Sequence, residues 1–358
     1  MKLGLAFSQD LMTPDNFRFA KQAGCTHVFA ALQKYSVRTF PPATPDGAEQ
    51  RIAFCEPDEA AWTYDGLRAM RAAINAEDLE CEAIQGFDVA HFHDVMLDGP
   101  RKAEQMEKLK RIISDMGRVG IPIMGYSFTL AGVWGRGSAG AARGGAPSPG
   151  FHDPPETPIP DGMVHGRVYD TDLYDEENPT GAVGQISYEE FWGRLREFLD
   201  EMLPVAEEAG VKMALHPEDP PMPTLRGTPR LVHGPDHFQQ LLDLNPSESN
   251  TMLFCVGTLA EMADGDIYEM VDRYSRTGRI GFVHLRNVRG RVPHYDEVFI
   301  DEGDVDMIRV LRILKQNGFD GIITPDHTPQ MSCGGWHAGK AHALGWIRAA
   351  LMAIEGEG

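Results

Sequence analysis

Short apolar runs recur along the chain, and each is followed by a polar residue, a glycine or a proline. Runs of this length, bounded by turn-forming residues, are typical of buried β-strands. The pattern therefore predicts a protein built on strands that are spaced along the whole sequence. The expected strands cover residues 3–7, 27–32, 81–86, 121–128, 212–216, 252–256, 280–285 and 321–325.

Between these runs, apolar residues recur at positions i, i+3 and i+4, which is the spacing of a helix with one buried face. Strands that alternate with helices predict a parallel α/β fold, and eight repeats predict a closed (β/α)8 TIM barrel. We expect one barrel domain over residues 1–358, with a doubly wound open sheet as the alternative. The expected helices cover residues 15–23, 58–76, 99–119, 188–209, 235–243, 266–277 and 305–317.

One segment interrupts this alternation directly after the fourth expected strand. Residues 129–186 are dense in glycine and proline and are too long for an ordinary βα loop. Because the segment leaves the barrel at its mouth, we expect a lid over the site or a dimer arm, with a passive surface insertion as the alternative. Residues 135–140 spell G-x-G-x-x-G, but no helical pattern follows them, so we reject a dinucleotide site.

Four residues suited to metal binding stand at the ends of the last four expected strands: His216, Cys255, His284 and Asp326. All strands of a (β/α)8 barrel point their C-terminal ends to one mouth, so these side chains should converge there. Two imidazoles, a thiolate and a carboxylate suit Zn(II), Fe(II) or Mn(II), with a position left open for substrate. The alternative is four unrelated residues, with hydrogen-bonded histidines, a small core thiol and a turn-capping aspartate.

Composition narrows the class of protein. The chain has 358 residues, a formal net charge of −20, a sequence pI of about 5.0 and no basic run, which argues against nucleic acid as a partner. Its five cysteines are odd in number and scattered, so we expect a reducing compartment and no disulfide framework. The chain enters a strand-like run at once and has no apolar stretch long enough for a membrane span. We therefore expect a soluble cytoplasmic enzyme without a membrane partner.

Motifs of the C-terminal half resemble, in order and spacing, those of the D-mannonate dehydratase family in the xylose-isomerase-like barrel superfamily. They are MALHPEDPP, GTPRLV, FCVGT, FVHLRN, EGDVDM and PDHTPQM. The N-terminal half resembles the family more loosely, through residues 22–32 and 125–128. The resemblance implies a (β/α)8 barrel, His327 as an acid/base, and dehydration of a hexonate to a 2-keto-3-deoxy acid. It also implies an ion of the Mn(II) type, with Fe(II) or Zn(II) as alternatives, held by His216, Cys255, His284 and Asp326.

Dehydration at such a metal site also needs groups that transfer protons and bind the substrate carboxylate, and three further residues are candidates. Removing a proton α to a carboxylate requires charge stabilisation, which a metal ion supplies, and a general acid must then help the β-hydroxyl leave. His327 directly follows Asp326 and could exchange protons near neutral pH, or else only orient a ligand. Arg286 could bind a substrate carboxylate or form an ion pair within the protein, and Arg230 is a second candidate anion anchor.

Several positions depart from the family pattern. Trp336 stands where the family carries a tyrosine that serves as a second acid/base, and indole is of no use for proton transfer. The second strand ends in Leu32 and Gln33 where the family has a histidine pair, and the third ends in Ile84 and Gln85 where it has an acidic residue. The loop after the fourth strand reads VWGRG in place of an acidic residue followed by tryptophan. These positions, including Trp336, are expected to face the substrate.

We therefore expect a metal-dependent sugar-acid dehydratase that converts D-mannonate to 2-keto-3-deoxy-D-gluconate and water. The alternatives are an isomerase or epimerase of the same superfamily, a lyase that eliminates a larger group from another carbohydrate, and a non-catalytic sugar-binding protein. The expected partner is a small-molecule sugar acid, and the expected assembly is a homo-oligomer, either a dimer or a tetramer.

Overall fold

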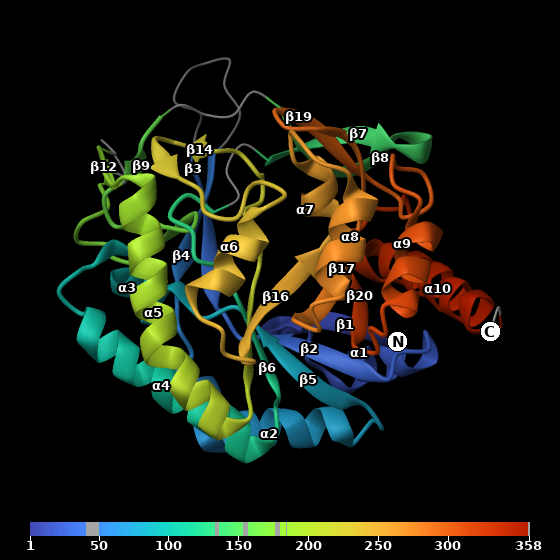
Figure 1. The fold of residues 1–358 in the computed structure, drawn as a ribbon, viewed down its shortest axis with the longest axis horizontal. Helices are drawn as coiled ribbons and strands as arrows, with labels where there is room; N and C mark the ends of the chain where they lie inside the picture. The colour runs from blue at the N-terminus through green and yellow to red at the C-terminus, as the bar shows by residue number, and fades with distance from the viewer. Residues whose placement is uncertain (41–49, 133–135, 153–156, 176–179, 184, 357–358) are drawn as a thin grey trace.

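A closed barrel of eight parallel strands forms the centre of the protein in a computed structural model (Figure 1). The structure describes residues 1–40, 50–132, 136–152, 157–175, 180–183 and 185–356. The barrel confirms the expected (β/α)8 fold and excludes the open sheet. In order around the barrel, the strands are β1 (Lys2–Ser8), β2 (His27–Ala31), β5 (Glu80–Gln85), β6 (Ile123–Tyr126), β13 (Lys212–Leu215), β16 (Asn250–Cys255), β17 (Ile280–Leu285) and β20 (Ile322–Pro325).

Helices surround the barrel, and several begin at a residue that caps the first turn. Ser187 accepts a hydrogen bond from the backbone N–H of Glu190 at 3.1 Å, and Asp306 accepts one from that of Arg309 at 3.0 Å. Among the described residues, no helix is long and apolar enough to cross a membrane. The principal helices are α1 (Pro14–Gln22), α2 (Tyr64–Asn75), α4 (Lys102–Val119), α5 (Tyr188–Ala209), α6 (His237–Leu244), α8 (Ile267–Ser275), α9 (Met307–Gln316) and α10 (Gly335–Glu355).

All seven expected helices are present, but the sequence pattern did not predict α10. Its alanine, glycine and apolar residues are spread around the helix, so the i, i+3, i+4 spacing of a single buried face is weak. The expected helix over residues 58–76 is interrupted at Thr63, which caps α2. The short helical segments are η1 (Gln9–Leu11), η2 (Glu59–Trp62), η3 (Val89–His91), α3 (His93–Leu97), η4 (Arg143–Gly145) and α7 (Val256–Glu261).

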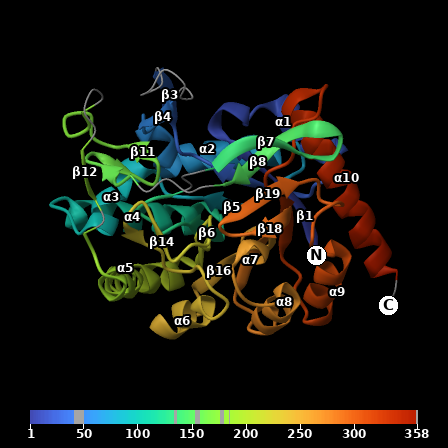
Figure 2. The same cartoon turned by 90° about the horizontal axis from the view of Figure 1, so that it is seen from above.

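The described parts of the 129–186 insertion form short strands that pair with other loops at the barrel mouth (Figure 2). Strands β7 (Arg136–Ala142) and β8 (Ala146–Phe151) join β18 (Asn287–Arg291) and β19 (His294–Val298) in one sheet. Strands β10 (Met163–Val164) and β11 (Arg167–Val168) join β3 (Tyr35–Phe40) and β4 (Gln50–Cys55) in another. The remaining pairs are β9 (Ile159–Pro160) with β12 (Gly181–Val183) and β14 (Thr224–Leu225) with β15 (Thr228–Pro229).

These pairings tie the insertion to the loops that follow the second and seventh barrel strands. Of the G-x-G-x-x-G segment, Gly135 lies outside the described residues, and the glycines that follow it belong to strand β7. A dinucleotide site needs a helix N-terminus after the glycines to bind the pyrophosphate, and here a strand stands in that place. The structure therefore agrees with our rejection of such a site. The lid, the dimer arm and the passive surface insertion all stay predictions.

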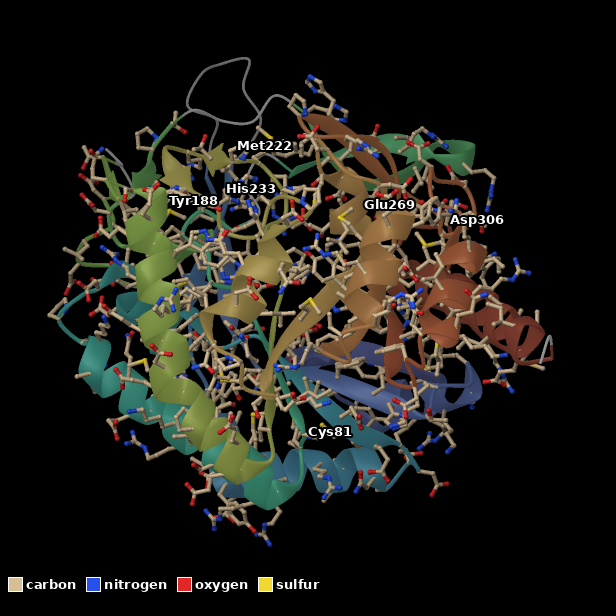
Figure 3. The ribbon with its side chains drawn as sticks, viewed as in Figure 1. Cys81, Tyr188, Met222, His233, Glu269 and Asp306 are labelled. Carbon is tan, nitrogen blue, oxygen red and sulfur yellow. The ribbon has the colours of Figure 1, made fainter. Side chains whose placement is uncertain are left out.

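Apolar side chains fill the barrel interior and the space between the barrel and its helices (Figure 3). Inside the barrel, the rings of Phe29 and Phe282 lie with their centroids 4.5 Å apart. Gly125 leaves room for the Phe282 ring, because a Cβ atom there would lie 3.1 Å from it. This packed interior makes the strand ends a rigid platform for the mouth. The interior cluster contains Phe29, Ala83, Ile123, Ala214, Leu253, Cys255, Phe282 and Ile322.

Candidate metal centre and cavity

A cavity of about 350 Å³ opens at the C-terminal ends of the barrel strands. Its size is in the range of small-molecule sites, and its position is where (β/α)8 enzymes hold their substrates. Three of the predicted metal ligands and the predicted acid/base line it. The strand ends contribute Ser8, Ala31, Gln85, Tyr126, His216, His284, Asp326 and His327, and the insertion contributes Thr129, Gly132, His165 and Arg167.

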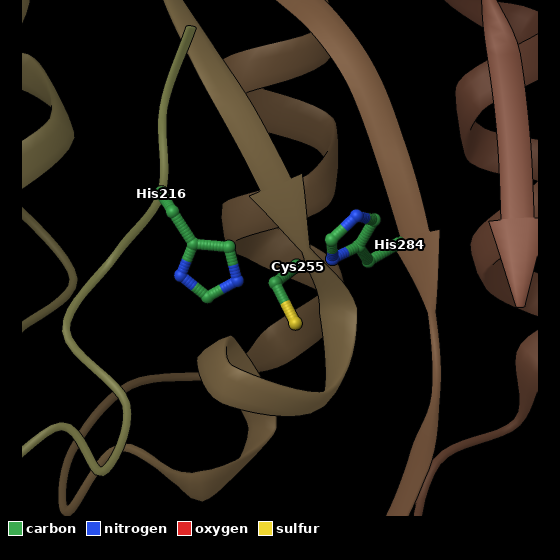
Figure 4. Close-up of side chains that lie close together, drawn as sticks. All are labelled: His216, Cys255 and His284. Carbon is green, nitrogen blue, oxygen red and sulfur yellow. The ribbon is translucent and has the colours of Figure 1, made fainter. Parts of the chain in front are cut away.

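Three of the four predicted metal ligands come together in one group. The potential ligand atoms of His216, Cys255 and His284 all lie within 4.8 Å of one another (Figure 4). Cys255 is the last residue of β16 and lies in register with His284 on β17, and His216 directly follows β13. The parallel register of neighbouring strands therefore produces the cluster that the sequence pattern predicted.

Asp326 lies beside this cluster, directly after β20. Its carboxylate oxygens lie 3.8 Å from Sγ of Cys255 and 3.8 Å from Nδ1 of His284. The structure thus brings the predicted fourth ligand next to two of the other three. A cation among these groups would meet an imidazole pair, a sulfur and a carboxylate.

The electrostatics of the cluster keep its acidic groups ionised. Burial alone would raise the pKa of the Cys255 thiol, but Arg286 and hydrogen bonds from His216 and His284 lower it to about 5. Burial would also raise the pKa of Asp326, but the neighbouring histidines and Arg286 hold it well below its usual range. Cysteine and aspartate bind a metal ion in these ionised forms, as a thiolate and a carboxylate.

The two histidines also present nitrogens suited to coordination. Nδ1 of His216 donates to the carbonyl oxygen of Pro217 at 2.6 Å, so Nε2 is the nitrogen that would bind a metal ion, once it gives up the proton that it donates to Cys255. Nδ1 of His284 is buried and has no hydrogen-bond partner among the described residues. A buried polar atom without a partner is costly unless a ligand satisfies it. The donor set therefore fits a divalent metal ion.

Arg286 lies beneath the cluster in a buried network of charges. Its guanidinium contacts Glu261 at 3.1 Å, Asp219 at 3.2 Å and Asp326 at 3.4 Å, and it also pairs with Glu297. Its side chain is fully buried and does not line the cavity. The carboxylates that it binds are the protein's own, so the geometry favours a structural role. Substrate binding by Arg286 stays only a prediction.

Arg230 is also buried and lies outside the cavity lining. It pairs with Glu218 at 3.0 Å and donates to the carbonyl oxygens of Gly132 at 2.8 Å and Pro220 at 3.0 Å. These contacts join the start of the insertion to the loop after β13. This placement too favours a structural role, and anion binding by Arg230 stays only a prediction.

His327 lines the cavity and is held by a residue that the sequence did not reveal. Its Nδ1 lies 3.0 Å from Glu297, whose side chain is 1% exposed, whereas that of His327 is 41% exposed. Because a carboxylate only accepts hydrogen bonds, Nδ1 donates, and Nε2 lies 3.7 Å from Asp326. Glu297 belongs to β19, and no local sequence signal indicated that this strand returns to His327.

Trp336 lies in the first turn of α10 and packs against aromatic residues. Its ring centroid is 5.8 Å from that of Phe7 and 6.1 Å from that of Phe19, and it does not line the cavity. The neighbouring His337 hydrogen-bonds Asn16 at 2.7 Å and is also outside the cavity lining. The geometry therefore favours a packing role for Trp336, and its predicted contact with substrate stays a prediction.

From this packing we expect Trp336→Tyr to leave turnover within about 3-fold of the parent, since the ring lies outside the cavity. Steady-state kinetics with D-mannonate would measure the effect. A matched Trp336→Phe variant separates the loss of indole from the gain of a phenol. A gain of about 10-fold or more in the tyrosine variant alone would place position 336 at the reacting groups.

Uncharged polar side chains also line the cavity. Gln33 and Gln85, two of the positions that depart from the family pattern, line it together with Ser127. Residues 133–135 of the VWGRG loop lie outside the described residues. The wall also includes the half-buried His165 and Arg167, which the sequence pattern did not single out because they belong to the insertion.

Comparison with known proteins finds mannonate dehydratases among the relatives of this chain. The family model for D-mannonate dehydratase (UxuA) matches residues 173–353. The mannonate dehydratase of Streptococcus pneumoniae is 28% identical over 291 residues, which cover 75% of this chain and 74% of the relative. Mannonate dehydratase 2 of Halalkalibacterium halodurans is 28% identical over 283 residues, which cover 74% of this chain and 79% of the relative.

Solved structures share the fold. The crystal structure of mannonate dehydratase from Streptococcus suis superposes with a TM-score of 0.77 at 23% identity and covers 100% of this chain and 94% of that one. A 3-keto-D-glucoside 4-epimerase from E. coli superposes with a TM-score of 0.57 at 11% identity and covers 98% of this chain and 99% of that one. At these identities, the likeness shows a common barrel and says nothing about the reaction.

Proposed function

The chain belongs to the D-mannonate dehydratase family, and from this premise we propose that it converts D-mannonate to 2-keto-3-deoxy-D-gluconate and water with the help of a divalent metal ion. One observation carries the proposal. His216, Cys255 and His284 lie together, with Asp326 and His327 beside them, at the mouth of one barrel. A non-catalytic sugar-binding protein would need neither a thiolate ligand nor a held imidazole.

The residues that would hold the metal are His216, Cys255, His284 and Asp326. We propose Mn(II) on the family resemblance, with Fe(II) or Zn(II) as alternatives that the same donors suit. When bound, the ion supplies positive charge next to the substrate carboxylate, which stabilises the negative charge that develops as the α-proton is removed. Arg286 keeps Cys255 and Asp326 ionised for this purpose from the buried side.

Proton transfer falls to His327 in this proposal. His327 lines the cavity, and Glu297 holds its ring through Nδ1, so Nε2 is the nitrogen that would exchange the proton. Dehydration removes the proton at C2 and the hydroxyl at C3, which leaves as water once it is protonated. An imidazole near neutral pH can serve either step.

The test is metal analysis of the purified protein followed by a screen of aldonic and uronic acids for a 2-keto-3-deoxy product. We expect about one divalent ion per chain and turnover of D-mannonate above that of its stereoisomers. A protein that carries the metal but forms a 2-keto-3-deoxy acid from a different sugar acid would contradict the proposed substrate and support the proposed type of reaction. A protein that isomerises or epimerises the sugar acid would contradict the proposed dehydration.

A further inference from the structure

A two-residue hairpin of the insertion forms part of the cavity wall. Val164 on β10 pairs with Arg167 on β11, and the turn between them consists of His165 and Gly166, with φ angles of 55° and 71°. Positive φ at both central residues is the signature of a type I′ hairpin turn, which glycine and asparagine adopt readily and histidine rarely. A strained residue of this kind often marks a functional position.

Further contacts fix the hairpin in place. Arg167 lies in register with Ala53 of β4 in a parallel pair, and the backbone N–H of His165 donates to the carbonyl oxygen of Leu130 at 2.7 Å. The hairpin is therefore joined both to the sheet that follows the second barrel strand and to the end of the fourth. Its side chains are presented to the cavity by a defined backbone.

The guanidinium of Arg167 has few partners. Nη1 donates to the carbonyl oxygen of His165 at 3.2 Å, and the group lies over the ring of Tyr35 at 4.8 Å from the centroid. Nε is buried without a hydrogen-bond partner, and among the described residues the side chain forms no ion pair with a carboxylate. Arg286 and Arg230, in contrast, are paired with carboxylates of the protein.

Arg167 is a positive charge in a cavity that is also lined by acidic side chains. The lining contains the carboxyl groups of Glu218, Asp219 and Asp326, and Arg167 is its single lysine or arginine among the described residues. The whole chain carries a formal charge of −20, so a sugar-acid anion approaches against an unfavourable field. A guanidinium presents paired N–H donors that match a carboxylate.

We propose that Arg167 binds the carboxylate of the substrate and makes the cavity selective for sugar acids over neutral sugars. The inference rests on the proposed function, because it assumes that the substrate is an anion of this class. It moves the anion-binding role from Arg286 and Arg230, which face the protein interior, to a residue of the insertion. The insertion thereby contributes to substrate choice as well as to the shape of the mouth.

The test compares two ligands of the same shape and different charge, D-mannonate and its neutral amide, D-mannonamide. Dissociation constants are measured by calorimetry on metal-loaded protein that carries His327→Asn, so that the substrate is bound and not consumed. Adding Arg167→Gln should weaken D-mannonate by roughly 10- to 100-fold, the effect of losing a charge-assisted hydrogen bond, and leave D-mannonamide within about 3-fold. Arg167→Lys should recover part of the loss, since it keeps the charge.

Arg143→Gln is the matched control. Arg143 belongs to the same insertion but is exposed, pairs with Asp301 at 3.1 Å and does not line the cavity. Its removal should leave both affinities unchanged. Unaltered affinity of the Arg167→Gln protein for D-mannonate would overturn the inference, and so would an equal loss for both ligands, which would indicate a damaged wall.

Failure of the proposed function gives a different result. A parent protein that binds D-mannonate but releases no dehydrated product would contradict the proposed reaction, while the comparison of the two ligands would still decide the role of Arg167. A parent protein that binds the amide as tightly as the acid would contradict the inference, whatever reaction it catalyses.

Discussion

Replacing Cys255 by alanine is expected to lower the bound divalent metal toward zero and the rate of dehydration by roughly 10³-fold or more, as expected when several kcal/mol of charge stabilisation are lost. The reason is that Cys255 lies at the centre of the donor group, within 4.8 Å of the ligand atoms of both His216 and His284. Plasma mass spectrometry of the purified variant gives the metal content, and steady-state kinetics give the rate.

The other three ligands should behave in the same way, so His216→Ala, His284→Ala and Asp326→Ala should also lose the metal. Cys255→Ser should be milder than Cys255→Ala, since an alkoxide-type oxygen is a poorer ligand for a soft-leaning ion but remains a donor. Full metal occupancy in any two of the alanine variants, with the fold unchanged, would show that the assignment is wrong.

Cys81→Ala is a matched control for the loss of a buried thiol. Cys81 is the second residue of β5, at the end of the strand opposite the mouth, and is labelled near the bottom of Figure 3. Burial raises its pKa to about 12, so it remains a thiol where Cys255 is a thiolate. The Cys81 variant should keep the metal and the activity of the parent.

The second large effect is expected for His327→Asn, which should keep the metal and lower turnover by roughly 10²-fold or more, the range for losing a general acid/base. Asparagine retains a polar group in contact with Glu297 but has no nitrogen that exchanges protons near neutral pH. Substrate affinity should change little, because the proposed role is in proton transfer. Turnover, the Michaelis constant and metal content are measured on the same preparation.

His294→Asn provides the comparison for a histidine on the loops of the mouth. His294 is exposed on β19 and does not line the cavity, so its replacement should leave turnover unchanged. Ordinary turnover in the His327→Asn enzyme would remove the mechanism proposed here. Loss of metal in that variant would instead assign His327 to the metal shell.

The fold could be predicted from the sequence because its signals are local. Each barrel strand is a short apolar run that ends at a polar residue or a turn, and the helices between them carry one apolar face. The metal group followed from the same regularity, since His216, Cys255 and His284 occupy equivalent places at consecutive strand ends. Because neighbouring parallel strands are in register, residues at equivalent places along them lie close together in space.

The rest of the site depends on contacts that no local pattern encodes. Glu297 reaches His327 through a strand that leaves the barrel and returns, and Arg167 reaches the cavity from the middle of a segment that reads as a Gly/Pro-rich loop. Arg286 was a candidate either for a substrate carboxylate or for an ion pair within the protein, and four carboxylates from other parts of the chain surround it. Which partner an arginine finds is decided by tertiary structure, and the sequence leaves it open.

The central claim is metal-dependent removal of water from a sugar acid, and mass spectrometry of the reaction in deuterated water tests it most directly. We predict a product from D-mannonate that is lighter by one water molecule and carries one carbon-bound deuterium at C3, formed by the metal-loaded protein, abolished by chelation and restored by Mn(II). A product that differs from D-mannonate only by exchanged deuterium would identify an epimerase or isomerase. Equal formation of dehydrated product by the chelated protein would contradict the account.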